Sequence, residues 1–477
     1  MDLSRASAAI LLCGFLIAGG GCQHAASSPL DLQSHLASWQ GREVDLTTVA
    51  EAAELIAPHE GEESAVFDPA DGLDLREVEA IALWYSPNLR VARLEAEGQL
   101  AVARSAGLLP DPEFSLEGGR KREETGGGGF MSGVPESVSS SWVSGASLSL
   151  TVPLSGRLQA EKVWRLAEFQ GSLKGVMEQE WKHLDRVHDT WLQWNGAQER
   201  VRLAEEQLAL VVQFADTTDQ LAAIGEIDST DARMFAIERG RMEVVREEAL
   251  QEKQQLQLEL FALMGLAPEA PVVIKPGFED PHGGLPEGDR RLRIAEGHPT
   301  IVRLKAEYEA TEERLRLELR RQYPDLVLSP GFSQEQNEMT WLLGTGIVVP
   351  VWNRNRQGIA EAVVARDTAR ARVEATYEEL LSELAQLEAQ LAAAQQQLRL
   401  LRDTVGPLTD QQLHEALALL HVGEASFTLM FTTLNQTHQV KQQLLDAVLD
   451  EQLAKARLHA LLTPHPVTAV QAEESAP

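Results

Sequence analysis

The stretch GASLSLTVP, residues 145–153, alternates strictly between apolar and small polar side chains and runs directly into a long helical pattern. Its apolar positions, from Ala146 to Val152, fall on one face of a strand, and its serines and threonine fall on the other. A second Val-Pro pair, Val349-Pro350, is also preceded by strand-like residues and followed by a long helical pattern. The chain therefore contains two hairpins that each lead into long helices.

The two hairpins belong to two copies of a larger unit. Ser86-Pro87-Asn88 opens the helical stretch before the first hairpin, and His298-Pro299-Thr300 opens the one before the second. Each later long segment is broken by a glycine turn, at Gly225 and Gly423. The predicted fold is mainly α with a small β part and an internal two-fold repeat. The expected divisions are a signal peptide 1–21, an arm 22–72, a first repeat 73–265 (hairpin about 112–153, long helices 158–265), a linker 266–288, a second repeat 289–463 (hairpin about 325–350, long helices 357–462) and a tail 464–477.

The N-terminus predicts export. Arg5 is followed by an apolar stretch, Ala8–Ile17, that falls short of the roughly 18 residues a spanning helix needs and is typical of a signal peptide. Cys22, preceded by Ala-Gly-Gly-Gly, resembles the acylated cysteine of bacterial lipoproteins; the alternative is an ordinary thiol beyond a conventional cleavage site. Because Cys13 lies in the removed segment, disulfides and cysteine metal sites are not expected.

Composition narrows the class of function. The net charge of −30, from 72 acidic against 42 basic residues, argues against a nucleic-acid partner. The chain contains no His-Glu-x-x-His, phosphate-binding glycine loop or Gly-x-Ser-x-Gly pattern. His183 and His188 stand five residues apart on a predicted helix and so point in different directions. We therefore expect no enzyme, no cofactor and no bound metal.

The long helices carry a coiled-coil repeat. Apolar residues step alternately by four and three through the second copy, which is a 3.5-residue period. As a helix, Glu161–Gly225 would extend about 96 Å and Glu361–Gly423 about 93 Å. Gly406-Pro407 is expected to kink or split the second helix. The repeat positions are Val373, Tyr377, Leu380, Leu384, Leu387, Leu391, Ala394, Leu398, Leu401, Val405 and Leu408.

The strands have the length of membrane strands. Each expected strand of about 9–11 residues would cross a bilayer when tilted. Four strands cannot close a channel alone, and an open edge cannot face lipid. Three chains would supply twelve strands and a closed barrel. The same alternation also fits a half-buried strand of a soluble domain.

Several motifs together resemble one family. VPVWNRNR at 349–356, GIAEA at 358–362, the two glycine turns and Leu263-Met264-Gly265 resemble the TolC-type outer-membrane efflux channels, over roughly Leu75–Leu462. The resemblance implies a homotrimer with a twelve-stranded barrel in the outer membrane, continuous with a helical periplasmic tunnel. It also implies a periplasmic adaptor and an inner-membrane transporter of the resistance-nodulation-division type as partners. Residues 353–361 look closest to the heavy-metal cation branch.

The resemblance and the residues nominate three sites. The glycine turns would meet the adaptor, although their serines could simply cap the returning helices. Carboxylates near the turns would form rings of three in a trimeric pore, although each could also be a solvated surface group. The strand-to-helix connections would be the barrel–tunnel joint. The residues are, for the adaptor, Gly225, Ile227, Ser229, Val422, Gly423 and Ser426; for the rings, Asp216, Asp219, Asp228, Asp231 and Glu424; and for the joint, Pro153, Pro350, Asn353, Arg354 and Arg356.

The favoured hypothesis is a lipid-anchored outer-membrane exit channel of a tripartite efflux system that conducts heavy-metal cations passively. Drug efflux and type I protein secretion are alternatives with the same architecture. A periplasmic coiled-coil scaffold lipoprotein without a pore is an alternative of another class.

Overall fold

The computed structural model describes residues 27–42, 44, 72–124, 138–277, 285–286, 288–335, 338–347, 349–422 and 426–463. Contacts divide the chain into two units, residues 1–43 and 44–477. The first unit contains helix α2 (Leu32–Gln40), which begins where the Asp31 carboxylate accepts hydrogen bonds from the amides of Gln33 and Ser34. The signal peptide, Cys22, most of the predicted arm and the tail lie outside the described residues.

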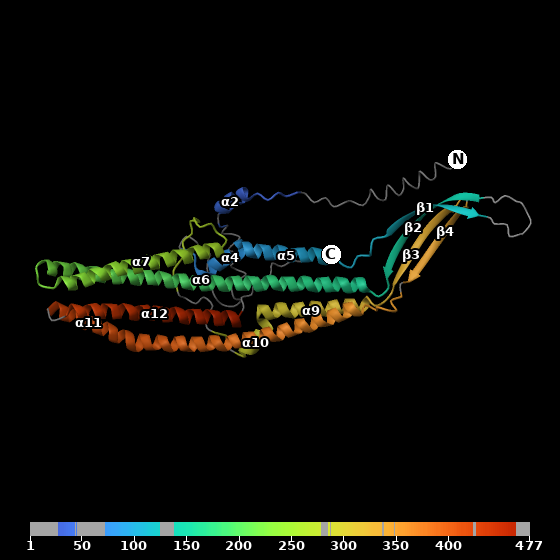
Figure 1. The fold of residues 1–477 in the computed structure, drawn as a ribbon. Coiled ribbons are helices and arrows are strands. Elements are labelled where there is room, and N and C mark those ends of the chain that lie inside the picture. Colours follow the sequence, from blue (N-terminus) through green and yellow to red (C-terminus); the bar gives the residue numbers. More distant parts are fainter. Residues whose placement is uncertain are drawn as a thin grey trace, which may run out of the picture. The chain divides into compact units, whose positions relative to one another are not determined.

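The second unit contains one antiparallel sheet of four strands in the order β1-β2-β3-β4. Both predicted hairpins contribute two strands, and β2 pairs with β3 to join them (Figure 1). β1, with 12 residues, and β2, with 16, are longer than the 9–11 residues expected. The strands are β1 (Glu113–Glu124), β2 (Val138–Pro153), β3 (Asp325–Glu335) and β4 (Glu338–Ile347).

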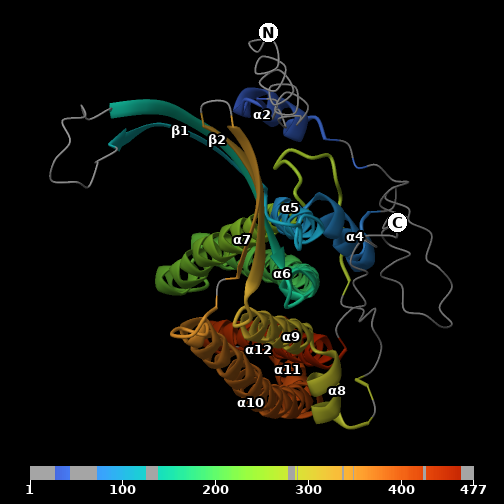
Figure 2. The same cartoon turned by 90° about the vertical axis from the view of Figure 1, so that its right-hand side faces the viewer.

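Helices make up the rest of this unit. Figure 2 shows them in two groups, the first repeat's α4 to α7 and the second repeat's α8 to α12. The prediction of a mainly helical fold with a small β part is confirmed. The helices are α4 (Leu75–Tyr85), α5 (Pro87–Arg104), α6 (Arg157–Ala223), α7 (Ser229–Leu263), α8 (Arg290–Gly297), α9 (Pro299–Arg320), α10 (Arg356–Leu400), α11 (Gly406–Val422) and α12 (Phe427–Leu462), with a π-helical segment η2 (Leu401–Val405) between α10 and α11.

The longest helix, α6, is the element on which the others pack. It contacts α4, α5, α7, α9 and α12. Leu184, Val187 and Trp191 on α6 are buried together with Ile81 of α4 and Leu260 of α7. No described helix is long and apolar enough to cross a membrane.

The predicted 3.5-residue repeat holds on α10 and fails beyond it. Leu380, Leu391 and Leu398 are buried, but Leu408 is 62% exposed, and Thr409 is buried in its place. The cause is the π-helical turn at η2, whose wider turn shifts the phase of every later residue. Pro407 cannot donate a backbone hydrogen bond, which favours this irregular turn. The break expected at Gly406-Pro407 is therefore a shift in which positions of the continuing helix are buried.

The linker after α7 is tied to the helices. Ile274 forms a parallel bridge with Leu73, just before α4. Further along, the Asn195 side chain on α6 accepts a hydrogen bond of 2.7 Å from the amide of Gly277. These contacts hold the linker against the start of the first repeat and against α6.

A buried histidine at the start of α9 makes this packing sensitive to acid. His298 is 1% exposed and lies edge-on to Trp181 of α6, with ring centroids 4.8 Å apart. Burial lowers the pKa of His298 from 6.5 to about 4, with a small opposing effect from Glu178 and a reinforcing one from Lys182. The imidazole is therefore neutral at neutral pH.

We predict that His298 costs stability in mild acid. Between pH 6.5 and about 4 the unfolded chain binds a proton that the folded chain does not, so stability present above pH 6.5 is lost as pH falls. The loss should reach on the order of 3 kcal/mol. Urea denaturation of wild type and His298→Phe at several pH values measures this loss. As pH falls through this window, the free energy of unfolding of the wild type should fall relative to that of the variant. A constant difference would contradict the prediction.

Candidate functional site: the sheet, the joint and the helical tip

The register sorts the sheet into two faces of opposite character. One face carries mostly small or polar side chains, several of which bond across the strands, although Val143, Val327 and Leu342 also lie on it. Ser115 and Ser147 hydroxyls are 2.7 Å apart, Ser329 donates to Ser149 over 3.3 Å, and the Lys121 ammonium lies 3.2 Å from the Glu335 carboxylate. Cross-strand pairs of this kind stabilise one face of a sheet, and they give this face a hydrophilic surface.

The other face is apolar and uncovered. Leu116, Trp341 and Leu343 are each exposed by more than 70%, and Phe332 contacts Trp341 with ring centroids 5.8 Å apart. A contiguous apolar surface of this kind marks contact with lipid or protein. Its members are Phe114, Leu116, Trp142, Ala146, Leu148, Leu150, Leu326, Leu328, Phe332, Met339, Trp341, Leu343 and Ile347.

The sheet also has two open edges. β1 pairs only with β2, and β4 pairs only with β3, so each carries an unpaired row of backbone groups among the described residues. Such edges are templates for further strand pairing.

Strand-to-helix joints hold the sheet on the helices. In the first, Arg157 at the start of α6 pairs with Asp325 of β3 at 3.0 Å. In the second, Asn355 adopts a left-handed conformation at φ 51° and donates to the Glu318 carboxylate at 2.6 Å. A Cβ on Gly358 would approach that carboxylate within 2.6 Å, so any larger residue there would displace the Glu318 and Asn355 side chains.

The predicted joint residues occupy this region with different roles. Pro153 ends β2, and Pro350 follows β4. Asn353, Arg354 and Arg356 are exposed, and neither arginine forms an ion pair with a described residue. Sequence reasoning missed Asn355, Glu318, Arg157 and Asp325; the cue was the second asparagine of the NRNR stretch, a residue type that tolerates left-handed backbone.

The first glycine turn is exposed. Gly225 has φ 77°, and Ile224 beside it is 70% exposed. The returning helix is capped by Asp228, which accepts a 3.0 Å hydrogen bond from the amide of Thr230, and this bond lowers the pKa of Asp228. The expectation that Ser229 caps α7 is wrong: Ser229 is the first helical residue, because aspartate at the preceding position already binds the free amides.

The second turn is described only in part. Val422 ends α11 and Ser426 precedes α12 without a side-chain cap; Gly423 and Glu424 lie outside the described residues. Of the predicted ring carboxylates, Asp216 lies 3.9 Å from Arg239. Asp219 and Asp231 are on α6 and α7 and form no ion pair within the described part of the chain.

Behind the turns, the hairpins of the two repeats pack together through aromatic rings. Phe235 of α7 is fully buried, with its ring centroid 6.0 Å from Phe214 of α6 and 5.9 Å from Phe431 of α12. Apolar contact at this point fixes the two hairpins to each other.

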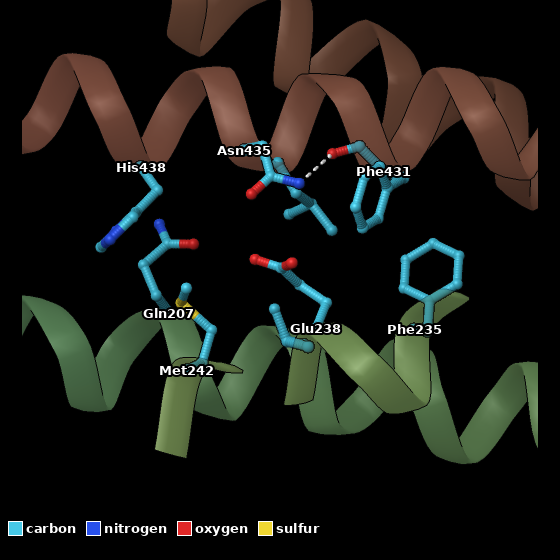
Figure 3. A pocket seen from close by; sticks show the side chains of 9 residues that line it. Gln207, Phe235, Glu238, Met242, Phe431, Asn435 and His438 are labelled. Carbon is cyan, nitrogen blue, oxygen red and sulfur yellow. Dashed lines mark hydrogen bonds between the residues drawn. The ribbon is translucent and has the colours of Figure 1, made fainter. Parts of the chain in front are cut away.

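A polar cavity interrupts this packing. Gln207, Glu238 and Met242 point from α6 and α7 toward Asn435 and His438 of α12 (Figure 3). Its volume of about 10 Å³ is room for one water molecule. Burial, with Arg241 and Lys441 nearby, lowers the pKa of His438. No group of three or more His, Cys, Asp or Glu suited to a metal occurs within the described ranges.

Comparison with known proteins identifies the architecture. Residues 81–266 match the family model of outer membrane efflux proteins. The cobalt-zinc-cadmium resistance protein CzcC of Cupriavidus metallidurans is 25% identical over 357 residues, which cover 70% of this chain and 82% of that protein.

Solved structures show the same fold. A membrane protein from Pseudomonas aeruginosa is similar with a TM-score of 0.69 at 20% identity, over 85% of this chain and 96% of the other. The open state of the Neisseria gonorrhoeae MtrE outer membrane channel is similar with a TM-score of 0.66 at 16% identity, over 85% of this chain and 94% of the other. These matches confirm the resemblance drawn from the sequence. Residues 81–266 thus match the outer membrane efflux protein family, and the chain has the fold of solved outer-membrane channels.

Proposed function

We propose that three copies of this chain form the outer-membrane exit channel of a tripartite efflux system and conduct heavy-metal cations passively. The observation that carries the proposal is the sheet: an apolar outer face, a hydrophilic inner face and two open edges. Drug efflux, protein secretion and a poreless periplasmic scaffold become outcomes of the tests below.

The open edges support a closed assembly. Unpaired backbone groups in lipid cost several kcal/mol each, so an apolar sheet can enter a membrane only if its edges meet. In a cyclic trimer, β1 of one copy would pair with β4 of the next, which closes twelve strands. The hydrophilic face would then line a lumen that continues between the long helices.

The family and the lipoprotein signal support the location. Acylation of Cys22 would anchor the chain in the bacterial outer membrane, with the helices in the periplasm. The partners would be a periplasmic adaptor and an inner-membrane transporter of the resistance-nodulation-division type.

The cargo is inferred from one relative and from charge. The similar protein CzcC is named for resistance to cobalt, zinc and cadmium. Asp219 and Asp231, repeated in three copies, would place rings of negative charge near the tip. Such rings favour cations over anions.

The adaptor would dock on the two turns at the helical tip. The residues are Gly225, Ile227 and Ser229 of the first turn and Val422, Gly423 and Ser426 of the second.

A deletion strain tests the cargo. We expect hypersensitivity to zinc, cobalt and cadmium with unchanged sensitivity to dyes and antibiotics, restored by the full chain. Growth inhibition by organic compounds alone would replace metals with drugs as the cargo. No change in any condition would favour the scaffold or a secretion role.

Complementation with variants separates the two roles assigned to the tip. Ile227→Asp introduces a charge at the turn and should abolish metal resistance while the chain still reaches the membrane. Asp219→Asn with Asp231→Asn should lower metal resistance partly, because the charge of the rings is reduced. Glu269→Gln, an exposed carboxylate outside the tip, is the matched control and should complement fully. Full metal resistance in the tip variants would contradict both the adaptor-docking role of the turn and the role of the charge rings.

A further inference from the structure

Charged side chains in the sheet are sorted by face. The carboxylates of Glu113, Glu117, Asp325, Glu335 and Glu338 lie on the hydrophilic face. Arg120 and Arg122 lie on the apolar face, Arg120 directly opposite Trp142 and Arg122 two residues beyond it. In a chain with a net charge of −30, the register thus places two guanidinium groups on the face that would contact lipid.

The height of the apolar face places the arginines at its rim. From Val152 to Trp142, β2 rises about 33 Å along the strand. With the usual tilt of barrel strands, that corresponds to a band about 25 Å tall, the typical height of the apolar belt of a membrane barrel. Trp352, 91% exposed, and Tyr323, 59% exposed, mark the end nearest the helices. Trp142 marks the other end.

Arg120 and Arg122 therefore lie where lipid headgroups begin. Arg120 is the cross-strand partner of Trp142, and its guanidinium lies over the indole ring at 5.0 Å from the centroid. Arg122 is two residues further out, about 5 Å higher along the membrane normal at that tilt. Arg120 forms no ion pair with any described residue, whereas Lys121, between them, points to the other face and pairs with Glu335.

We propose that Arg120 and Arg122, with Trp142 beneath them, bind the phosphate of an anionic lipid headgroup at the loop end of the sheet. Guanidinium groups form paired hydrogen bonds with phosphate oxygens, and an indole at the interface packs against the lipid beside them. The inference rests on the proposed function, because it requires the apolar face to contact lipid.

The test compares three full-length proteins purified in detergent: wild type, the double variant Arg120→Ser/Arg122→Ser, and Lys121→Ser as the matched control. Each is titrated with phosphatidylglycerol and with phosphatidylcholine, and lipid binding is followed by native mass spectrometry. Wild type and Lys121→Ser should prefer phosphatidylglycerol. The double variant should lose that preference by about 30-fold, the effect of removing two cations near a headgroup layer. Inorganic phosphate should not displace the lipid.

Three results would overturn the inference: an unchanged preference in the double variant, an equal loss in Lys121→Ser, or displacement by inorganic phosphate, which would indicate a general anion site. Membrane extraction and oligomer mass, measured on the same samples, keep the two proposals apart. A wild-type chain that does not insert contradicts the proposed function and this inference together. An inserted oligomer without lipid preference contradicts the inference alone.

Discussion

The two open edges of the sheet are the constraint on which the rest of the molecule depends. Backbone amides and carbonyls on β1 and β4 need partners, and lipid offers none. Only another copy of the same sheet supplies a matching edge with the same apolar face outward. The alternation in residues 145–153, the small residues facing inward and the exposed aromatic side chains all acquire a reason once the edges meet. In the proposed trimer, the fold of one chain is part of a larger closed structure.

The joints and the long helices follow from that closure. Arg157 with Asp325, and Asn355 with Glu318, connect the strands to helices that must continue the same ring. Two repeats give similar connections, but they are not equivalent. The π-helical turn before Pro407 shifts the buried positions of α11, whereas the described first repeat runs as α-helix from Arg157 to Ala223. The hairpins nevertheless pack together through Phe235, so the two repeats form a continuous core near the tip.

Periodicity in the sequence was enough to predict the helical content and both hairpins, because those features repeat over many residues, and short motifs such as residues 349–356 supplied the family resemblance. The details that depend on one backbone conformation were missed. Asp228 caps α7 in place of Ser229, since a one-residue shift in the cap leaves the periodicity unchanged. Leu408 is exposed because the π-helical turn shifts the phase of the helix. A heptad pattern in the sequence does not reveal such a turn. The role of Asn355 depends on Glu318, 37 residues earlier, and no local pattern links them.

Cross-linking of the edge strands tests the closed assembly most directly. Ser115→Cys on β1 and Thr340→Cys on β4 place thiols on the hydrophilic face at opposite edges of one sheet, so they can meet only between copies. In membranes treated with a short thiol cross-linker, we expect species of one, two and three chains, with three the largest. Each single variant should remain uncross-linked. A double variant that gives only single chains, or a ladder that extends past three, would contradict the closed trimer.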